Sequence, residues 1–188
     1  LNKYITEFIV VESKFTHSGE KRALLFDINK YSKFKNKINY IVLENEPENL
    51  ETINDKDSID KKNSKYIMNA LKRENFQRNA ISRGLKKVNP DDLILISDVD
   101  EIPDLSNLNL ENINDEIILF KQNFYYYKFN LMLEDLPWLG TKACKHKMLK
   151  SPQWLRNIKD KKFSFFRIDT FFSKTKYINK KFIDNGGW

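Results

Sequence analysis

Three acidic side chains follow the clearest candidate for a buried strand. The run Leu93–Ile96 is apolar and β-branched, and Asp98, Asp100 and Glu101 come directly after it. In an open α/β sheet, ligands bind beyond the carboxyl ends of the strands. Side chains two apart in an extended backbone point the same way, so Asp98 and Asp100 can face one hard divalent cation, Mn2+ or Mg2+. Without such a cation the acids would repel one another, and the alternative is an acidic loop that only solvates the strand end.

A second charged pair lies in the longest predicted helix, which we expect Ser64 to cap. Glu74 and Arg78 are four residues apart in the middle of a stripe that should face the sheet, where charge is costly unless it is paired. The pair predicts a brace within the helix. In the alternative, Arg78 reaches the acidic segment or a diphosphate. The stripe consists of Ile67, Leu71, Glu74, Arg78, Ile81 and Leu85.

Strands and helices alternate in the first half of the sequence. The expected elements are a strand at residues 8–11, a basic helix from Asp27 to about Lys37, a strand at 38–43 and a long surface loop at 44–63. This alternation predicts an α/β fold with a mainly parallel sheet. We expect one domain over residues 1–188, with a nucleotide-binding-like half at about 1–104 and a more irregular, aromatic-rich half at about 105–188.

The composition is that of a basic globular protein. The 188 residues are 40% apolar, and 33 Lys and Arg against 26 Asp and Glu give a net charge of +7. Such a surplus can indicate a polyanionic partner. Most of these cations are lysines, however, which lack the guanidinium fork that reads bases and clamps phosphates. A basic nucleic-acid-binding module is therefore the weaker alternative.

Targeting signals are not evident in the sequence. Cys144 is the single cysteine, which excludes an internal disulfide and favours a cytoplasmic location. No apolar run approaches the roughly 18 residues of a membrane span, and the first residues do not form a signal peptide. Because the sequence does not begin with Met, we expect any anchoring segment to lie outside it.

Several motifs together point to a known family. In order, they are Phe8-Ile9-Val10-Val11-Glu12-Ser13 with Thr16-His17-Ser18-Gly19, then Glu74-Asn75-Phe76-Gln77-Arg78-Asn79, Asp91-Asp92-Leu93-Ile94-Leu95, Asp98-Val99-Asp100-Glu101-Ile102-Pro103, Trp138-Leu139-Gly140-Thr141 and Gly186-Gly187-Trp188. Their order and spread resemble glycosyltransferase family 17, which includes β-1,4-mannosyl-glycoprotein 4-β-N-acetylglucosaminyltransferase. The resemblance implies a GT-A, Rossmann-like fold and inverting, metal-assisted transfer of a sugar, first of all N-acetylglucosamine, from a UDP-sugar to a glycan acceptor.

The same resemblance implies roles for single residues. Asp98 and Asp100 match the acids that bind metal and nucleotide-sugar, and Glu101 completes their motif. Glu12, His17 and Arg78 fall in motifs that we assign to nucleotide-sugar binding, although a histidine in a turn is more often structural. Family members usually carry an earlier strand and a histidine after the Gly-Gly-Trp. We therefore expect the chain to continue beyond both ends and, as given, to be a poor catalyst.

Inverting transfer needs a base that takes the proton of the acceptor hydroxyl. Carboxylates at Glu134, Asp135, Asp169 and Asp184 are candidates. We prefer Asp135 because it precedes Trp138, whose aromatic face can hold a sugar, and Glu101 is the other catalytic candidate. A solvated surface role is the alternative for each acid. Tyr125, Tyr126 and Tyr127 are expected to stack on the acceptor or, in part, to enter the core.

The expected partners are a UDP-sugar donor and a glycan carried by a glycoprotein, a glycolipid or a polysaccharide. We expect no nucleic acid, and membrane association only through segments outside this chain. The composition, rich in lysine and asparagine and without a disulfide, favours a bacterial or viral cytoplasmic protein over a eukaryotic Golgi enzyme. A catalytically silent sugar-binding domain is the second alternative.

Overall fold

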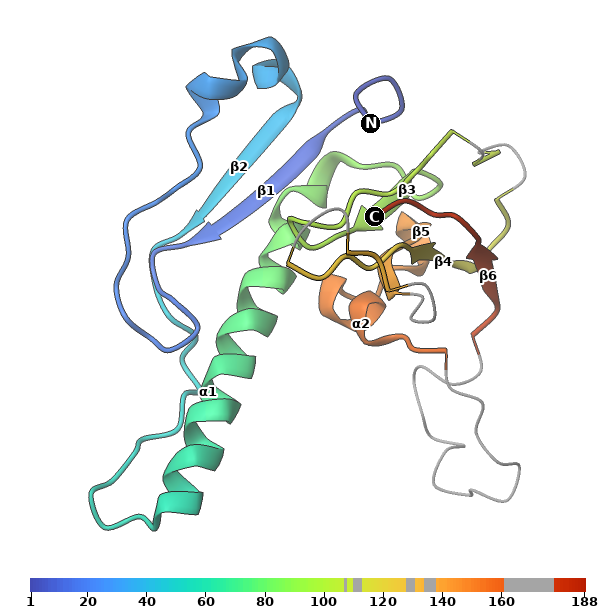
Figure 1. The fold of residues 1–188 in the computed structure, drawn as a ribbon. Helices are drawn as coiled ribbons and strands as arrows, with labels where there is room; N and C mark the ends of the chain where they lie inside the picture. Colours follow the sequence, from blue (N-terminus) through green and yellow to red (C-terminus); the bar gives the residue numbers. More distant parts are fainter. Residues whose placement is uncertain (107, 110–112, 128–130, 134–137, 161–177) are drawn as a thin grey trace, which may run out of the picture. The chain divides into compact units, whose positions relative to one another are not determined.

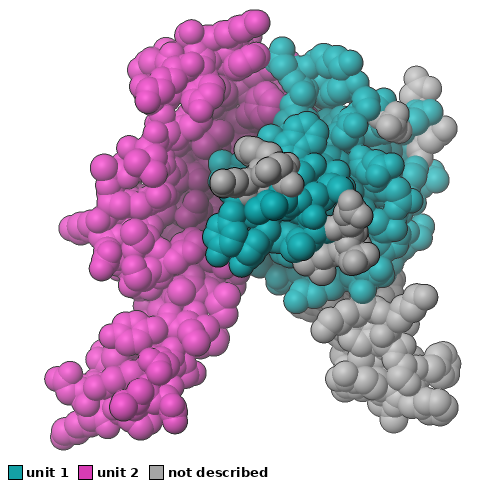
Figure 2. Space-filling view, in the orientation of Figure 1, with its two compact units in different colours: residues 1–4, 88–188 teal, residues 5–87 magenta. Residues whose placement is uncertain are grey.

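The computed structural model describes residues 1–106, 108–109, 113–127, 131–133, 138–160 and 178–188. The chain forms two compact units, one of residues 5–87 and one of residues 1–4 with 88–188 (Figures 1 and 2). This division differs from the halves expected from the sequence, because the strand at Leu93–Ile96 and the acids after it belong to the second unit. Each unit is described by itself.

A parallel pair of strands forms the sheet of the first unit. Strand β1 (Phe8–Ser13) pairs with β2 (Ile38–Leu43) in parallel register, from Phe8 opposite Ile38 to Ser13 opposite Leu43. Both strands were predicted. The connection contains a 3-10 helix at Ile28–Lys37, and the Asp27 side chain caps it by accepting from the Asn29 N–H. This basic segment buries no side chain. It therefore lacks the packing of an apolar face that stabilises most α-helices in proteins.

Helix α1 (Ile59–Asn79) begins earlier than predicted. Its N-cap is Ser58, whose side chain accepts a hydrogen bond from the Lys61 N–H, so the prediction of Ser64 as the cap is wrong. The surface loop accordingly ends before residue 58. The first turns of α1 are polar and solvated, so they lack the apolar period that would have predicted a helix, although their lysines are good helix formers.

The predicted buried stripe on α1 is also wrong in its first half. Ile67 is 61% exposed and Leu71 is 44% exposed. The buried residue of α1 is Asn69, which exchanges two hydrogen bonds of 2.8 Å with the backbone of Glu51. This part of the helix therefore holds the preceding loop through polar contacts. Beyond Asn79 the chain continues in short 3-10 turns, so the stripe does not run on in α-helical geometry.

The second unit contains a four-stranded mixed sheet in the order β3-β5-β4-β6. Its strands are β3 (Leu93–Ile96), β4 (Ile117–Gln122), β5 (Trp138–Lys145) and β6 (Lys180–Ile183). Strand β5 is antiparallel to both β3 and β4, and β6 is parallel to β4. The α/β class is confirmed, but the sheet is not mainly parallel: among the described strands, two pairings are parallel and two are antiparallel.

The core of the second unit lies on β4, β5 and the short helix α2 (Pro152–Asn157). Residues 117–120 are fully buried, as are Cys144 of β5, Leu155 of α2 and Ile158. Burial raises the pKa of the Cys144 thiol to about 12, so the thiol stays protonated and unreactive. No helix among the described residues is both long and apolar enough to cross a membrane.

Candidate functional site

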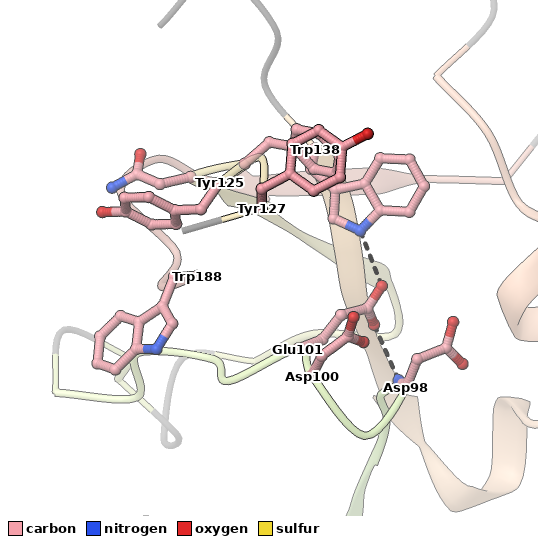
Figure 3. A pocket seen from close by; sticks show the side chains of 9 residues that line it. Asp98, Asp100, Glu101, Tyr125, Tyr127, Trp138 and Trp188 are labelled. Atoms are coloured by element: carbon pink, nitrogen blue, oxygen red, sulfur yellow. Dashed lines mark hydrogen bonds between the residues drawn. The ribbon is translucent and has the colours of Figure 1, made fainter. Parts of the chain in front are cut away.

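The acids after β3 form a closed turn. We name residues 98–101 the acidic turn. The Glu101 N–H donates to the Asp98 carbonyl over 3.1 Å, and the Asp98 N–H donates to Glu101 Oε2 over 3.0 Å. The backbone is turned here, not extended as expected, and Asp98 and Asp100 nevertheless line the same cavity. Figure 3 shows both side chains on the turn, below the aromatic rings of the cavity.

An arginine from α2 neutralises part of the acidic turn. Arg156 Nη2 lies 2.6 Å from Asp98 Oδ2 and 2.5 Å from Glu101 Oε1, and Nη1 lies 2.9 Å from Glu101 Oε2. Burial by itself would lower the pKa of Arg156, but the hydrogen bonds and charges of Glu101 and Asp98 outweigh it and raise that pKa. The chain thus supplies a cation for acids that, from the sequence, were expected to need an external one.

Glu101 is the centre of this arrangement. Its side chain is only 6% exposed. The carboxylate accepts from Arg156, from the Asp98 N–H and, over 2.8 Å, from the indole Nε1 of Trp138 at the start of β5. Glu101 therefore ties together the turn, α2 and β5. Its catalytic role stays a prediction.

A cavity of about 380 Å³ opens beside the acidic turn. One wall carries carboxylates and the opposite wall carries aromatic rings (Figure 3). Phe124 and Trp138 pack together with ring centroids 5.8 Å apart. Aromatic faces cover apolar surface while carboxylates accept hydroxyl hydrogen bonds, a combination that suits a polyhydroxylated ligand. The lining residues are Asp98, Asp100, Glu101, Asn123, Phe124, Tyr125, Tyr127, Trp138 and Trp188.

The last three residues brace the acidic turn from the other side. Ile102 and Trp188 exchange backbone hydrogen bonds of 2.5 and 3.1 Å, and the Asp104 N–H donates to the Gly186 carbonyl over 2.9 Å. The Asn123 N–H donates to the Gly187 carbonyl over 2.8 Å. The Gly-Gly-Trp motif thereby joins the segment after the turn to the end of β4 and brings Trp188 to the cavity.

Gly187 is required for this brace, which gives a first testable prediction. Its φ is +112°, and a Cβ there would lie 2.1 Å from the Ile102 carbonyl oxygen. We expect Gly187→Ala to cost about 1–3 kcal/mol through backbone strain alone, and more if the brace separates. Urea unfolding measures the loss. Asp184→Ala is the control, because it removes only an exposed ion pair with Lys121; equal stability of the two variants would contradict the prediction.

Comparison with protein families settles the broad class of the chain. The sequence pattern of glycosyltransferase family 17 matches residues 1–157. The chain belongs to glycosyltransferase family 17. Members of a glycosyltransferase family transfer a sugar from a donor to an acceptor, so this chain is a transferase of that general kind. Searches of the curated proteins and of the solved structures find no significant match.

Three of the residues assigned to nucleotide-sugar binding in this family 17 chain lie in the first unit, away from the acidic turn in sequence. Arg78 Nη2 lies 2.9 Å from Glu74 Oε1, which confirms the predicted brace within α1. His17 is exposed, and its carbonyl oxygen accepts a hydrogen bond of 3.1 Å from Arg73 Nη1. The same guanidinium lies against Gly19, whose φ of +98° shapes the turn. Roles of His17 and Arg78 in nucleotide-sugar binding stay predictions.

Glu12 of the family signature is buried and anchors the loop that follows β1. Its carboxylate accepts hydrogen bonds from the Leu25 N–H at 2.7 Å, the Phe26 N–H at 3.1 Å and the Tyr40 hydroxyl at 2.6 Å. Burial acts to raise the pKa of Glu12, but these hydrogen bonds and Arg22 outweigh burial and lower it. Burial and Glu12 raise the pKa of Tyr40 to about 12. A contact of Glu12 with the nucleotide-sugar stays a prediction.

The lowered pKa of Glu12 predicts a pH-dependent loss of stability in Glu12→Gln. The folded state favours the carboxylate, so its stabilisation is present above the ordinary value of 4.5 and is lost as the pH falls through the lowered folded value. At pH 7 we expect a loss of about 1–3 kcal/mol, which shrinks towards pH 3. Urea unfolding across that range, with exposed Glu20→Gln as the control, measures it. A loss that does not change with pH would contradict the prediction.

The remaining predicted catalytic residue, Asp135, lies outside the described residues, as do Glu134 and Asp169. Asp184 pairs with Lys121 at 2.7 Å and is 75% exposed, as a solvated surface acid would be. Arg156 was not found from the sequence. The only local signal was Ser151-Pro152, which begins α2 with a side-chain cap on the Trp154 N–H, and nothing nearby indicates where the arginine points.

Proposed function

We propose that this family 17 chain is an inverting, metal-assisted glycosyltransferase with a GT-A type arrangement. We take its donor to be a UDP-sugar, first of all UDP-N-acetylglucosamine, and its acceptor to be a glycan of a glycoprotein, glycolipid or polysaccharide. One observation carries the proposal: Asp100 lines a cavity with an aromatic wall, in a turn that directly follows a buried strand. Family membership supports sugar transfer in general, and the finer assignments are ours.

The side chains of the acidic turn fit a cation that arrives with the donor. Among the described residues, no three His, Cys, Asp or Glu side chains converge as a metal site. Asp98 is paired with Arg156, and Asp100 makes no hydrogen bond or ion pair within the described part of the chain. Mg2+ and similar ions are commonly held by one or two carboxylates together with substrate phosphates. Asp100 would therefore hold the ion first, with Asp98 as the second ligand.

Such an ion neutralises the charge that develops on a leaving diphosphate. The protein supplies the positions of the reacting groups. Trp138, Tyr125 and Tyr127 lie on the wall opposite the carboxylates, where they would cover the apolar faces of sugars and exclude water from the cavity. The acidic turn, fixed by Glu101, keeps its carboxylates in place without reorganisation during the reaction.

Transfer also needs a base. The acceptor oxygen attacks the anomeric carbon, the bond from that carbon to the diphosphate oxygen breaks, and UDP departs with the electron pair while the base takes the hydroxyl proton. Glu101 already accepts hydrogen bonds at both carboxylate oxygens, so it has little capacity left for that proton. Among the other candidates we propose Asp135 as the base, because it precedes Trp138, which lines the cavity.

A UDP-release assay tests this proposal. UDP-N-acetylglucosamine, UDP-glucose and UDP-galactose are each offered with glycoprotein, glycolipid and polysaccharide acceptors, with and without Mn2+. We expect UDP release that requires both the acceptor and Mn2+, and we expect it to be fastest with UDP-N-acetylglucosamine. Binding of UDP-sugar without release for any acceptor would instead favour a catalytically silent sugar-binding domain.

A further inference from the structure

Arg156 is a part-buried cation within a predominantly acidic site. Its side chain is 12% exposed, and beyond its bonds to Asp98 and Glu101 its Nη1 donates to the Gly140 carbonyl oxygen over 2.5 Å. The guanidinium thus contacts both the acidic turn and β5. Three carboxylates and one guanidinium leave the site with a net negative charge.

The backbone around Arg156 is fixed independently of these ion pairs. Helix α2 begins with the Ser151 cap, and Leu155 next to Arg156 is fully buried. Lys142, itself 4% exposed, donates from Nζ to the Arg156 carbonyl oxygen over 2.5 Å. The backbone from which the Arg156 side chain extends is therefore held by the core of the unit, and the ion pairs are not needed to place it.

We propose that Arg156 is the resident counter-cation of the acidic turn: a positioning residue that holds Asp98 and Glu101 and so leaves Asp100 as the carboxylate offered to the incoming cation and donor. This inference rests on the proposed function. Arg156 competes with the metal for Asp98, and in the absence of donor it keeps the affinity of the turn for a divalent cation low.

Arginine suits this role better than lysine. A guanidinium stays charged at every physiological pH, and its planar fork donates to two carboxylates at fixed angles. A lysine ammonium at position 156 would keep the charge but would not hold Asp98, both oxygens of Glu101 and the Gly140 carbonyl at once. Arg156→Lys therefore separates positioning from charge, whereas Arg156→Gln removes both.

The first readout needs no ligand. Trp138 Nε1 donates to the Glu101 oxygen that also contacts Arg156, so the indole N–H signal in an NMR spectrum reports the arrangement of the turn. The signal is assigned with Trp138→Phe. We expect Arg156→Gln, and to a smaller degree Arg156→Lys, to shift this signal and speed its hydrogen exchange. An unchanged indole signal in a folded Arg156→Gln variant would overturn the positioning role.

The second readout is the affinity for Mn2+ alone, measured by electron paramagnetic resonance. Removing the positive charge should tighten Mn2+ binding by about tenfold in Arg156→Gln, because Asp98 becomes available and the local potential more negative. At saturating Mn2+, both variants should bind UDP-N-acetylglucosamine about tenfold more weakly than the parent, because the turn is no longer held. Mn2+ binding that weakens in Arg156→Gln would show a merely structural arginine.

Two further comparisons separate a failure of this inference from a folding defect and from a failure of the proposed function. If Arg156→Gln does not fold, Arg156→Lys decides: we expect parental Mn2+ affinity with weakened donor binding, and parental donor binding would overturn the inference. If the parent binds no UDP-sugar in the presence of Mn2+, the proposed function fails. The indole signal still decides whether Arg156 positions the turn.

Discussion

Asp100→Asn is expected to lower the Mn2+-dependent affinity for a UDP-sugar by more than about 100-fold, with little change in melting temperature. Asparagine keeps the shape of the side chain but removes the negative charge that a hard cation requires. Substitution of residues that merely orient a metal ligand already costs 10- to 100-fold, so loss of the proposed ligand should cost more. Asp100 is exposed and makes no ion pair within the described part of the chain, so stability has no reason to fall.

Calorimetric titration with UDP-N-acetylglucosamine and a thermal melt measure the two effects of Asp100→Asn separately. Asp115→Asn is the matched control, because Asp115 is a surface acid that pairs with Lys147 and does not line the cavity. Donor affinity equal to that of the parent would remove Asp100 from the site. A large drop in melting temperature would mean that Asp100 stabilises the fold instead.

Glu101→Gln should have the opposite profile, with a large loss of stability. The substitution takes the main partner from the part-buried Arg156 guanidinium, and breaking a largely buried ion pair in this way typically costs about 3–5 kcal/mol. Asp98 pairs with the same guanidinium but is more exposed, so it compensates only in part. For a chain of this size we expect the melting temperature to fall by about 10 °C.

Asp100→Asn is the matched control for Glu101→Gln, since the two positions are adjacent and the chemical change is the same. Thermal unfolding of both variants under one set of conditions makes the comparison. Equal melting temperatures would contradict the assignment of Glu101 to holding the turn. A Glu101→Gln variant that stays as stable as the parent but loses turnover would restore the prediction of a catalytic Glu101.

The strands that the sequence predicted are those whose signal is local. Strands β1, β2 and β3 are short apolar runs bounded by polar residues, and the Asp27 cap was equally visible. Strand β5 gave no such signal, because the residues of its buried segment Gly-Thr-Lys-Ala-Cys are either small or polar. Its burial depends on the neighbours β3 and β4 on either side, which local pattern cannot indicate.

The acidic turn shows the same limit at the level of the site. The acids at 98, 100 and 101 follow a strand and were predicted to lie at the sheet edge. Which of them would be neutralised depends on Arg156, which is 58 residues away from Asp98 along the chain. The backbone at these acids is not extended as expected, because the chain turns at Asp98 as soon as the strand ends. Local sequence therefore predicted the candidate ligands, while their pairing is a property of the folded unit.

On the proposed function, the cavity beside the acidic turn binds a UDP-sugar together with a divalent cation. Calorimetric titration of the whole chain with UDP-N-acetylglucosamine, once with Mn2+ and once with a chelator, tests it most directly. We predict saturable binding at one site per chain that requires Mn2+ and is displaced by UDP. Absence of binding for every UDP-sugar in the presence of Mn2+ would contradict the claim, and tight, salt-sensitive binding of an oligonucleotide in its place would favour a basic nucleic-acid-binding module.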